Sequence, residues 1–421
     1  MRPSRASNEK IGADPIRGRV GKVEPEVTQS TDPIAGAARE QQFHEDTMRM
    51  TAAVLYEQGL PRPYVVSRPL KIESIDLDGP GDGEILVRVA AAGLCHSDLS
   101  TIDNSRPRAL PAVLGHEGAG IVADVGGGVR DLAIGDHVVF VFAASCGNCR
   151  NCARGRPNIC RRWPEMRARG ELPTGGRRLS RDGRFVAHYS GISCFAEYAV
   201  VGRSSLVRID PSVPLVDAAM FGCAVQTGVG AAVNTAGLRP GDVVAIVGLG
   251  GVGLSCLLGA RVAGAQRIIA VDLSEEKLGL ARQLGATDTF NASDPDCIKE
   301  IREATGGGVD YAFEMAGSIK ALSLSAEILD RGGCVVSAGL SPATATYAIN
   351  HANLVGDEKS IRGCYMGSCI PERDVPVFIE LYKQGRLPID RLKSGTILLD
   401  DINAGFDRLA DVAAVRQIVT F

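Results

Sequence analysis

Short apolar runs separated by Gly and Pro dominate the chain from Met50 to about Thr227. Two examples are GEILVRVAAAGL and GDHVVFVF. Runs of this length between turn-forming residues are typical of antiparallel strands joined by turns. The pattern therefore predicts a β-rich domain in this part of the chain.

From about Gly228 to Gly363 the pattern changes to apolar strands that alternate with amphipathic helices. The predicted elements are, in chain order, VVAIVG, LSCLLGARVAG, RIIAVD, SEEKLGLARQLG, VDYAFEMAG, IKALSLSAEILDRGG and CVVSAG. This alternation predicts an α/β fold, a parallel sheet with helices on its faces. After Cys364 the chain returns to mixed helix and strand until Phe421.

Residues 1–47 differ from the rest because they are rich in Arg, Glu, Ser, Pro and Gly and have no sustained apolar pattern. Such a segment buries too little surface to order itself, so we predict a disordered extension. Folded sequence is predicted to begin at Met48 or Met50, and either methionine is a candidate start. Acidic residues such as Glu9 and Asp14 argue against a transit peptide.

The composition is that of an ordinary globular protein, with 421 residues, 45% of them hydrophobic, and a formal net charge of -3. The length suggests about two to three domains. Nearly balanced charge disfavours a nucleic-acid-binding protein. An uncharged stretch over residues 243–260 contains five glycines, which predicts a turn and not a membrane helix. We therefore expect a cytoplasmic protein with no nucleic-acid or membrane partner.

Four closely spaced cysteines in CGNCRNCARGRPNIC predict a metal site; they are Cys146, Cys149, Cys152 and Cys160. Four thiolates close a tetrahedral shell around Zn²⁺ and leave no open position, as in a structural site. An iron–sulfur cluster fits less well, because the bacterial run continues with three residues and then Cys-Pro. Here seven residues intervene and Arg161 follows. A disulfide framework suits a short secreted chain, and a nucleic-acid zinc knuckle needs a basic surface.

A glycine-rich turn follows the predicted strand VVAIV and contains Gly248, Gly250, Gly251 and Gly253. A helix pattern begins at Leu254. Glycines in this context permit a tight turn and the approach of backbone to a pyrophosphate, which then faces the free N–H groups of the helix. The sequence predicts a dinucleotide site here.

The second predicted strand ends at Asp272, which lies 19 positions after Gly253. An acid at this place binds ribose hydroxyls and repels a 2′-phosphate, so the sequence favours NAD over NADP. Lys277, one helical turn later, is either a second ribose contact or a solvated helix charge.

Three further residues suggest a second metal site: Cys95 in CHSDLS, His116 in GHEGAG and Cys223 in FGCAVQTGVG. Two thiolates and one imidazole leave zinc one open position, as catalytic zinc requires. Spacing alone does not join these residues, because a solitary Cys or His is more often packed in a core.

The segments GLCHSDL, LGHEGAG, the four-cysteine loop, FGCAVQTGVG and GLGGVG follow one another in the order and spacing of the zinc-dependent medium-chain alcohol dehydrogenases. The chain resembles this family from roughly Thr51 to Phe421. It is similar to the class III, glutathione-dependent formaldehyde dehydrogenase subgroup through GISCFAEYAVV and FDRLADVAAVRQIVTF. The resemblance implies a doubly wound Rossmann domain over residues 228–363. It also implies a β-rich, GroES-like catalytic domain with two zinc sites over residues 48–227 and 364–421.

The resemblance also implies roles for individual residues. It implies that Cys95, His116 and Cys223 hold catalytic zinc and that the four-cysteine loop holds structural zinc. The other implied roles belong to Glu117 and Asp98 beside the metal ligands, Ser97 as the acceptor of the alcohol proton, His96 and Arg416 at the pyrophosphate, Thr227 at the nicotinamide and Phe142 in the substrate pocket. Several relatives carry a histidine where this chain has Ser100, so ribose or water must finish the proton relay here.

The expected function is reversible oxidation of an alcohol to an aldehyde or ketone, with NAD and two zinc ions per subunit of a homodimer or homotetramer. Glutathione- or other thiol-dependent formaldehyde oxidation is the alternative, because the resemblance puts the Arg-rich segment 161–184 at the pocket mouth. Its arginines either receive an anionic adduct or face water. A non-catalytic dinucleotide-binding sensor is a weaker alternative, because the candidate zinc ligands and Ser97 are all present.

Overall fold

The computed structural model of the chain describes residues 47–142, 144–411 and 415–421. The predicted disordered extension lies outside the described residues, except for Thr47. Among the described residues, the first strand is β1, which begins at Met48.

Two sheets, mostly antiparallel, contain the short apolar runs of the first part of the chain. One has the strand order β8-β7-β2-β1-β4-β9 and the other has β11-β6-β5-β3-β19-β18, with β10 paired to β3. Their bounds are β1 Met48–Leu55, β2 Leu70–Leu77, β3 Glu84–Gly93, β4 Ala112–Val113, β5 Gly118–Val125, β6 His137–Phe140, β7 Leu179–Arg181, β8 Arg184–Phe185, β9 Ala187–His188, β10 Tyr198–Gly202, β11 Leu206–Arg208, β18 Lys393–Leu398 and β19 Arg416–Thr420. The predicted strands in GEILVRVAAAGL and GDHVVFVF correspond to β3 and β6.

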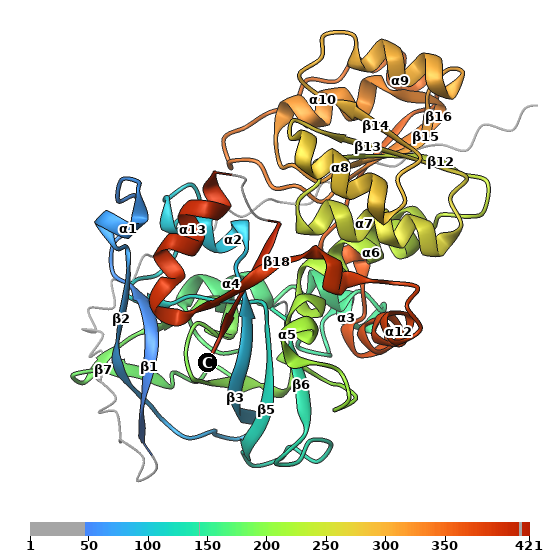
Figure 1. Cartoon of the computed structure of the whole chain (residues 1–421). Coiled ribbons are helices and arrows are strands. Elements are labelled where there is room, and N and C mark those ends of the chain that lie inside the picture. Colours follow the sequence, from blue (N-terminus) through green and yellow to red (C-terminus); the bar gives the residue numbers. More distant parts are fainter. Residues whose placement is uncertain (1–46, 143, 412–414) are drawn as a thin grey trace, which may run out of the picture. The chain divides into compact units, whose positions relative to one another are not determined.

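A third sheet is parallel throughout and has the order β14-β13-β12-β15-β16-β17. This is the doubly wound order, in which the third, second and first strands precede the fourth, fifth and sixth. The strands are β12 Val243–Val247, β13 Arg267–Asp272, β14 Asp288–Asn291, β15 Val309–Glu314, β16 Leu329–Ser337 and β17 Ser360–Gly363. The connecting helices, drawn in yellow to orange in Figure 1, are α7 Gly251–Ala263, α8 Glu275–Leu284, α9 Cys297–Thr305, α10 Ile319–Glu327 and α11 His351–Gly356. The predicted α/β fold class is confirmed.

Local sequence explains where these helices begin and end. The Ser274 side chain accepts a hydrogen bond from the backbone N–H of Lys277 at the start of α8, and Ser318 caps α10 in the same way. Gly264 and Gly285 end α7 and α8 in the left-handed conformation that glycine adopts without a steric penalty. The caps therefore set the lengths of the connecting helices.

Two predicted boundaries in this region are wrong. The helix expected from Leu254 begins at Gly251, so the last glycines of the turn already belong to α7. The helix expected over 319–333 ends at Glu327, and strand β16 begins at Leu329. Leu329 is buried and pairs with Val309 of β15, so sheet pairing overrides the helical pattern there.

The C-terminal segment contributes two strands, β18 and β19, to the second of the two mostly antiparallel sheets, in the β-rich half of the described chain. Strand β19 pairs antiparallel with β3, with Ile418 opposite Gly93, and pairs parallel with β18. The helices of this half are α1 Tyr64–Ser67, α2 His96–Ile102, α3 Arg150–Ala153, α4 Trp163–Arg169, α5 Leu215–Ala218, α6 Ala224–Gly230, α12 Pro371–Lys383 and α13 Ile402–Ala410. Thr227, where the sequence predicts the change of domain, lies inside α6, which continues directly into a π-helical turn over Ala231–Ala236.

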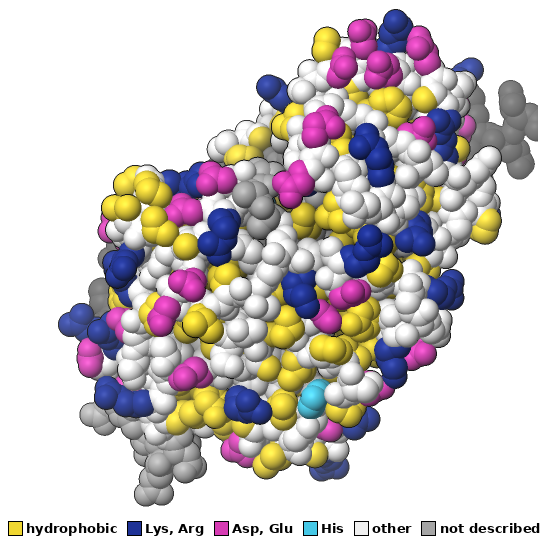
Figure 2. All heavy atoms as spheres, in the orientation of Figure 1, with side chains coloured by type: hydrophobic (Ala, Val, Ile, Leu, Met, Phe, Trp, Pro, Cys, Tyr) yellow, Lys and Arg dark blue, Asp and Glu magenta, His cyan; other side chains and the backbone are white. Residues whose placement is uncertain are grey.

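Figure 2 shows Lys and Arg side chains interspersed with Asp and Glu over the visible face of the described residues. No single helix among the described residues is both long and apolar enough to cross a bilayer. The bent pair Leu215–Gly222 and Ala224–Ala236 meets the length and composition criteria only when its two helices are taken together.

Candidate active site and metal centres

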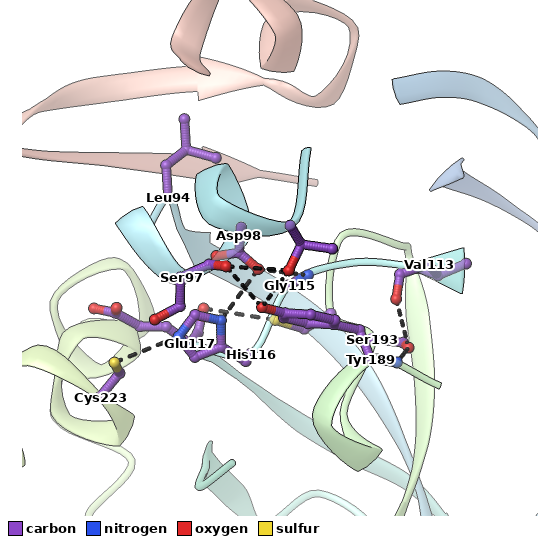
Figure 3. A network of polar contacts seen from close by, with 12 residues as sticks. Leu94, Ser97, Asp98, Val113, Gly115, His116, Glu117, Tyr189, Ser193 and Cys223 are labelled. Atoms are coloured by element: carbon purple, nitrogen blue, oxygen red, sulfur yellow. Dashed lines mark hydrogen bonds and ion pairs between the residues drawn. The ribbon is translucent and has the colours of Figure 1, made fainter. Parts of the chain in front are cut away.

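Four buried side chains converge between β3, β4 and α6. The ligand atoms of Cys95, His116, Glu117 and Cys223 all lie within 4.8 Å of one another. Figure 3 shows His116 between Asp98 and Cys223. The structure therefore brings together the three residues that sequence spacing alone does not connect.

Backbone geometry explains how these residues reach one place. Cys95 precedes α2 in an extended conformation, and Cys223 occupies the break between the 3-10 turn Ala219–Gly222 and α6. Gly115, just before His116, has a φ of +91°, and a Cβ there would lie 2.6 Å from the backbone nitrogen of Phe195. Only glycine fits such a position, which explains the glycine in the GHEGAG segment.

Asp98 sets the orientation of the His116 ring. The Nδ1 atom of His116 lies 3.1 Å from Asp98 Oδ1, which also accepts the backbone N–H of Gly115 at 3.2 Å. The other ring nitrogen, Nε2, lies 3.5 Å from Cys223 Sγ. With Nδ1–H donating to Asp98, Nε2 keeps its lone pair directed toward the sulfur cluster, as a metal-binding imidazole requires.

The electrostatics of this cluster favour a bound cation. A hydrogen bond from the Cys223 thiol lowers the pKa of Cys95 well below its usual value, although burial opposes this shift. Burial raises the pKa of Glu117 to about 7, although Arg416 acts in the opposite direction. Arg416 Nη1 lies 3.2 Å from Glu117 Oε2 without hydrogen-bonding geometry, so both carboxylate oxygens are buried without a hydrogen-bond partner.

The donor set fits zinc. Two thiols and an imidazole are the ligands of catalytic zinc sites, and they leave a fourth position free. The Glu117 carboxylate, which is ion-paired with Arg416 but accepts no hydrogen bond, adds negative charge beside these ligands. Cys95, His116 and Cys223 are thus the residues that would hold the ion.

The four-cysteine loop forms a second cluster around α3. The Sγ atoms of Cys146, Cys149, Cys152 and Cys160 lie within 4.8 Å of one another. The backbone N–H of Arg161 donates to Cys149 Sγ at 3.5 Å, and this contact is the main reason that the pKa of Cys149 falls to about 6. Burial and neighbouring sulfurs raise the pKa of Cys152 to about 12. Four sulfurs this close cannot all ionise without a cation, so this set also fits zinc.

In the glycine turn between β12 and α7, some glycines are required by close backbone contacts, whereas another leaves free space beside the turn. A Cβ on Gly253 would lie 1.8 Å from the carbonyl oxygen of Gly248, and one on Gly248 would lie 2.7 Å from the backbone nitrogen of Ala316. A Cβ on Gly250 would meet nothing within 4 Å. Gly250 is therefore the position that leaves space for a ligand, whereas Gly248 and Gly253 permit the turn itself.

Asp272 and Lys277 lie beside this turn. The Asp272 carboxylate accepts the backbone N–H groups of Leu249 at 2.6 Å and Ser274 at 3.0 Å. Lys277 is only 9% exposed, and burial lowers its pKa. The interpretation of Lys277 as a solvated helix charge is therefore wrong, since its side chain packs beside the acid.

Arg416 joins the glycine turn to the metal cluster. Its Nη1 atom donates to the carbonyl of Leu94 at 2.8 Å, immediately before Cys95. Its guanidinium also fills the space beside Gly251, where a Cβ would lie 2.5 Å from Nε. The residue as a whole is 4% exposed. One buried cation thus contacts both predicted sites.

The remaining predicted residues lie around the cluster at different depths. The Phe142 ring lies 5.2 Å from the His116 ring, and the backbone N–H of Thr227 donates to the carbonyl of Cys223 at 3.0 Å. Ser97 is half-buried in the first turn of α2, whereas His96 is exposed. These positions are compatible with a pocket wall and a cofactor contact.

Sequence reasoning missed two aromatic residues of this site. Tyr189 is buried, its ring lies 5.9 Å from His116, and its hydroxyl donates to the Ser97 carbonyl at 2.9 Å. Tyr365 packs edge-on against Phe142 at 6.0 Å. Neither belongs to a motif with recognisable spacing, so no local signal distinguishes it from an ordinary core aromatic.

Comparison with known families matches both halves of the chain. Residues 81–211 match the alcohol dehydrogenase GroES-like domain, and residues 251–384 match the zinc-binding dehydrogenase domain. An S-(hydroxymethyl)glutathione dehydrogenase of Synechocystis sp. is 38% identical over 378 residues, which are 89% of this chain and 100% of that protein.

Solved structures agree with the sequence comparison. The benzyl alcohol dehydrogenase of Acinetobacter calcoaceticus aligns with a TM-score of 0.83 and 34% identity, covering 89% of this chain and 99% of that chain. A putative zinc-binding dehydrogenase from Sinorhizobium meliloti 1021, solved with NADP, aligns with a TM-score of 0.74 and 28% identity over 89% of this chain and 100% of that chain. Because the likeness spans both halves and includes a relative at 38% identity, this chain belongs to the zinc-dependent medium-chain alcohol dehydrogenases.

Proposed function

We propose that this enzyme oxidises a primary or aromatic alcohol to the aldehyde with NAD, and reduces the aldehyde in reverse, using the cluster of Cys95, His116 and Cys223. The observation that carries the proposal is the geometry of His116. Asp98 occupies its Nδ1 atom, so Nε2 lies free beside two thiols and a buried carboxylate. A binding module without catalysis has no need for this oriented donor set.

When bound, zinc acts as a Lewis acid on the alcohol oxygen, and NAD accepts the hydride. Ser97 accepts the proton of the alcohol from the first turn of α2. The Tyr189 hydroxyl and Thr101 Oγ1 both donate to the Ser97 carbonyl, at 2.9 Å and 3.3 Å, which holds this turn in place. Phe142 packs against both His116 and Tyr365, so the two aromatic rings place apolar surface on one side of the metal cluster.

Arg416 and Asp272 are proposed to orient the dinucleotide. Arg416 lies against the first turn of α7, where its charge adds to the free N–H groups that attract a pyrophosphate. Asp272 is held by two backbone N–H groups at the end of β13, in position to accept ribose hydroxyls and to repel a 2′-phosphate. The preference for NAD over NADP rests on this acid.

Oxidation of a formaldehyde–thiol adduct is the second candidate function. It is favoured by the 38% identity to a protein named S-(hydroxymethyl)glutathione dehydrogenase. Both candidates use the same metal cluster, so they differ only in what the outer pocket accepts. We also propose a homodimer or homotetramer in the cytoplasm, as the family resemblance implies, and sedimentation of the purified protein measures the subunit number.

Two substitutions test the assignment of the metal sites. Cys95→Ala should remove about one zinc per subunit together with turnover, because an open site with two ligands holds the ion poorly. Cys149→Ser should also remove about one zinc but lower the thermal midpoint, because structural zinc contributes to folding free energy. Metal analysis, thermal denaturation and NADH absorbance distinguish the two variants. Full activity in Cys95→Ala would contradict the proposal. A Cys149→Ser variant that is stable but inactive would show that the catalytic and structural sites are assigned the wrong way round.

The substrate is tested with benzyl alcohol, a short aliphatic alcohol, and formaldehyde with and without glutathione. Rates with the plain alcohols support the first candidate. A strict requirement for the thiol supports the second. Bound zinc without NAD reduction across the whole panel would instead indicate a non-catalytic protein.

A further inference from the structure

The four-cysteine loop contains a buried polar residue that is not one of its metal ligands. Asn158 lies in the 3-10 turn Pro157–Ile159, two residues before Cys160, and is 3% exposed. Its Nδ2 atom donates to the backbone carbonyl of Tyr365 at 2.8 Å, whereas its Oδ1 atom is buried without a hydrogen-bond partner. The nitrogen must face Tyr365, because the reversed amide would place two acceptors against each other. The bond to Tyr365 is therefore the interaction that favours a buried amide at this position.

The partner of Asn158 begins a left-handed turn. Tyr365 is followed by Met366, Gly367 and Ser368, whose φ values are +51°, +63° and +52°. This backbone conformation is unfavourable for Met and Ser, so such a turn persists only where its surroundings hold it. The Tyr365 carbonyl closes the turn by accepting the backbone N–H of Ser368 at 3.1 Å. The same carbonyl accepts the Asn158 amide, so the four-cysteine loop helps to hold the turn.

This turn also packs directly against helix α6, which begins immediately after the candidate metal ligand Cys223. A Cβ on Gly367 would lie 2.1 Å from the carbonyl oxygen of Gln226, so no side chain fits between the turn and the helix. A shift of the turn would therefore press on α6 or separate the turn from it. The backbone at Tyr365 is thus fixed both by α6 and by Asn158.

The Tyr365 ring extends this connection to the metal cluster. It packs edge-on against Phe142, with 6.0 Å between the ring centroids, and Phe142 packs edge-on against His116 at 5.2 Å. Phe142 lies four residues before Cys146, the first cysteine of the four-cysteine loop. Both aromatic residues are therefore attached to this loop, Phe142 through the chain and Tyr365 through the Asn158 amide.

We propose that Asn158 is a positioning residue through which the four-cysteine loop contributes to the choice of alcohol. The inference rests on the proposed function and concerns the same site. By holding the Tyr365 carbonyl, Asn158 keeps the Tyr365 ring against Phe142. Phe142 and Tyr189 both contact the His116 ring, so the metal ligand is bordered by aromatic surface. Because aromatic rings pack favourably edge-on or offset against one another, this surface selects an aromatic alcohol over an aliphatic one of similar size.

The kinetic experiment compares benzyl alcohol with 1-hexanol in the zinc-loaded enzyme. In Asn158→Leu, which keeps a similar volume but has no donor, the ratio of the two kcat/KM values should fall by about 3- to 10-fold, mainly through KM for benzyl alcohol. Tyr365→Ala should lower the ratio by a similar factor. The double variant should have the same ratio as Tyr365→Ala alone, because Asn158 acts through that ring.

Asn151→Leu is the matched control. Asn151 lies in the same loop, and its Nδ2 atom also donates to a backbone carbonyl, but this carbonyl belongs to Ile159 of the loop itself, at 2.7 Å. The control should lower the thermal midpoint and keep the wild-type ratio, as expected for an asparagine that serves only the loop. Metal analysis ensures that the variants are compared at equal zinc content. A ratio that is unchanged in Asn158→Leu, or that falls equally in Asn151→Leu, overturns the inference.

A measurement on the wild type tests the inference even if Asn158→Leu does not fold. Hydrogen exchange, measured by mass spectrometry, compares the enzyme–NADH complex with and without benzyl alcohol, which cannot react because the cofactor is already reduced. The alcohol should slow exchange over residues 157–163 by about threefold or more, because the pocket and the loop are coupled through Tyr365. Residues 126–136, the connection between β5 and β6, are the internal reference and should exchange equally in both samples.

The possible results separate this inference from the proposed function. Unchanged exchange over residues 157–163 on binding of benzyl alcohol overturns the inference but leaves the proposed function intact. Absence of turnover with every alcohol in the wild type overturns the proposed function itself.

Discussion

Asp98 decides which nitrogen of His116 faces the sulfur atoms. It is fully buried and accepts hydrogen bonds from the His116 ring and from Gly115. A carboxylate in this position fixes the tautomer of the ring and makes Nε2 a stronger ligand. Glu117, the residue after His116, has a different environment, because neither of its carboxylate oxygens has a hydrogen-bond partner. Two adjacent carboxylates therefore support the cluster in different ways, one by orientation and one by charge.

Replacing Asp98 by Asn tests this orientation. Asn keeps the shape but removes the charge, so we expect zinc affinity at the catalytic site to fall by about 10- to 100-fold. Competition with a chromophoric chelator measures the change. Asp103→Asn, at the exposed end of the same helix, is the control and should bind zinc normally. Unchanged affinity in Asp98→Asn would show that the ring is oriented by packing alone.

His188 gives the protein a pH-dependent stability that is independent of the metal ligands. It is 2% exposed, and its Nε2 accepts the backbone N–H of Arg178 at 3.1 Å. Burial, together with the charge of Arg178, lowers its pKa from 6.5 to about 3. Because the folded pKa lies below the unfolded value, the unfolded chain binds the proton first as the pH falls. The stability that neutral His188 contributes is thus complete above about pH 6.5 and decreases toward pH 3.

The free energy of unfolding should therefore fall by about 2 kcal/mol between pH 6.5 and pH 5 through this residue alone. Urea denaturation of the wild type and of His188→Gln at both pH values separates this contribution from other titrating groups. The variant is expected to be less stable at neutral pH but to lose less stability on acidification. Parallel pH profiles of the two proteins would contradict the prediction.

At the scale of single elements, different glycines of the turn between β12 and α7 serve folding and ligand binding. Gly253 and Gly248 lie where any side chain meets backbone, whereas the position of a Cβ on Gly250 is open. The N-terminus of α7 directly follows this open position. The turn thus contains glycines that build it and one that leaves room for a ligand beside the helix N–H groups.

Two alanine substitutions distinguish these roles. Gly250→Ala should leave the thermal midpoint of the cofactor-free protein unchanged but weaken NADH binding by about tenfold or more, because its methyl group occupies the space of a pyrophosphate. Gly253→Ala should lower the thermal midpoint, since its Cβ overlaps the Gly248 carbonyl. Thermal denaturation and titration of NADH fluorescence provide the two measurements. Normal NADH binding in Gly250→Ala would place the cofactor elsewhere.

At the scale of the whole molecule, the C-terminal strand joins parts that are far apart in sequence. Strand β19 pairs with β3, and its first residue, Arg416, contacts both Glu117 and the start of α7. Arg416 and Glu117 are 5% and 0% exposed, so each charge depends on the other. Removing one member of a buried pair leaves the other uncompensated.

Arg416→Met should therefore destabilise the protein by about 3 kcal/mol or more, because it leaves the Glu117 carboxylate buried without a cation. The double variant Arg416→Met/Glu117→Gln should recover part of this loss. Chemical denaturation of the four proteins in this cycle gives the coupling free energy. If the double variant is no more stable than Arg416→Met, the pair does not interact significantly in the folded protein.

The fold and much of the candidate site were predictable because their signals are local. The alternation of strands and helices marks the parallel sheet, and the glycine turn and the four-cysteine loop are each contained in fewer than about twenty residues. Boundaries were less predictable where long-range pairing competes with local preference. Leu329 follows a helical pattern in sequence but becomes a strand residue because Val309 pairs with it.

The sequence by itself determines the local features of the site. These are the glycine turn at residues 248–253, the thiols of the four-cysteine loop, and Asp272 at the end of the second strand of the parallel sheet. Only the tertiary structure brings Cys95, His116 and Cys223 together and places Arg416 and Tyr189 beside them. The physical reason is the range of the interactions. A turn or a cluster of near neighbours is specified by backbone sterics and short spacing, whereas contacts between residues far apart in the sequence follow from the burial and packing of the whole core.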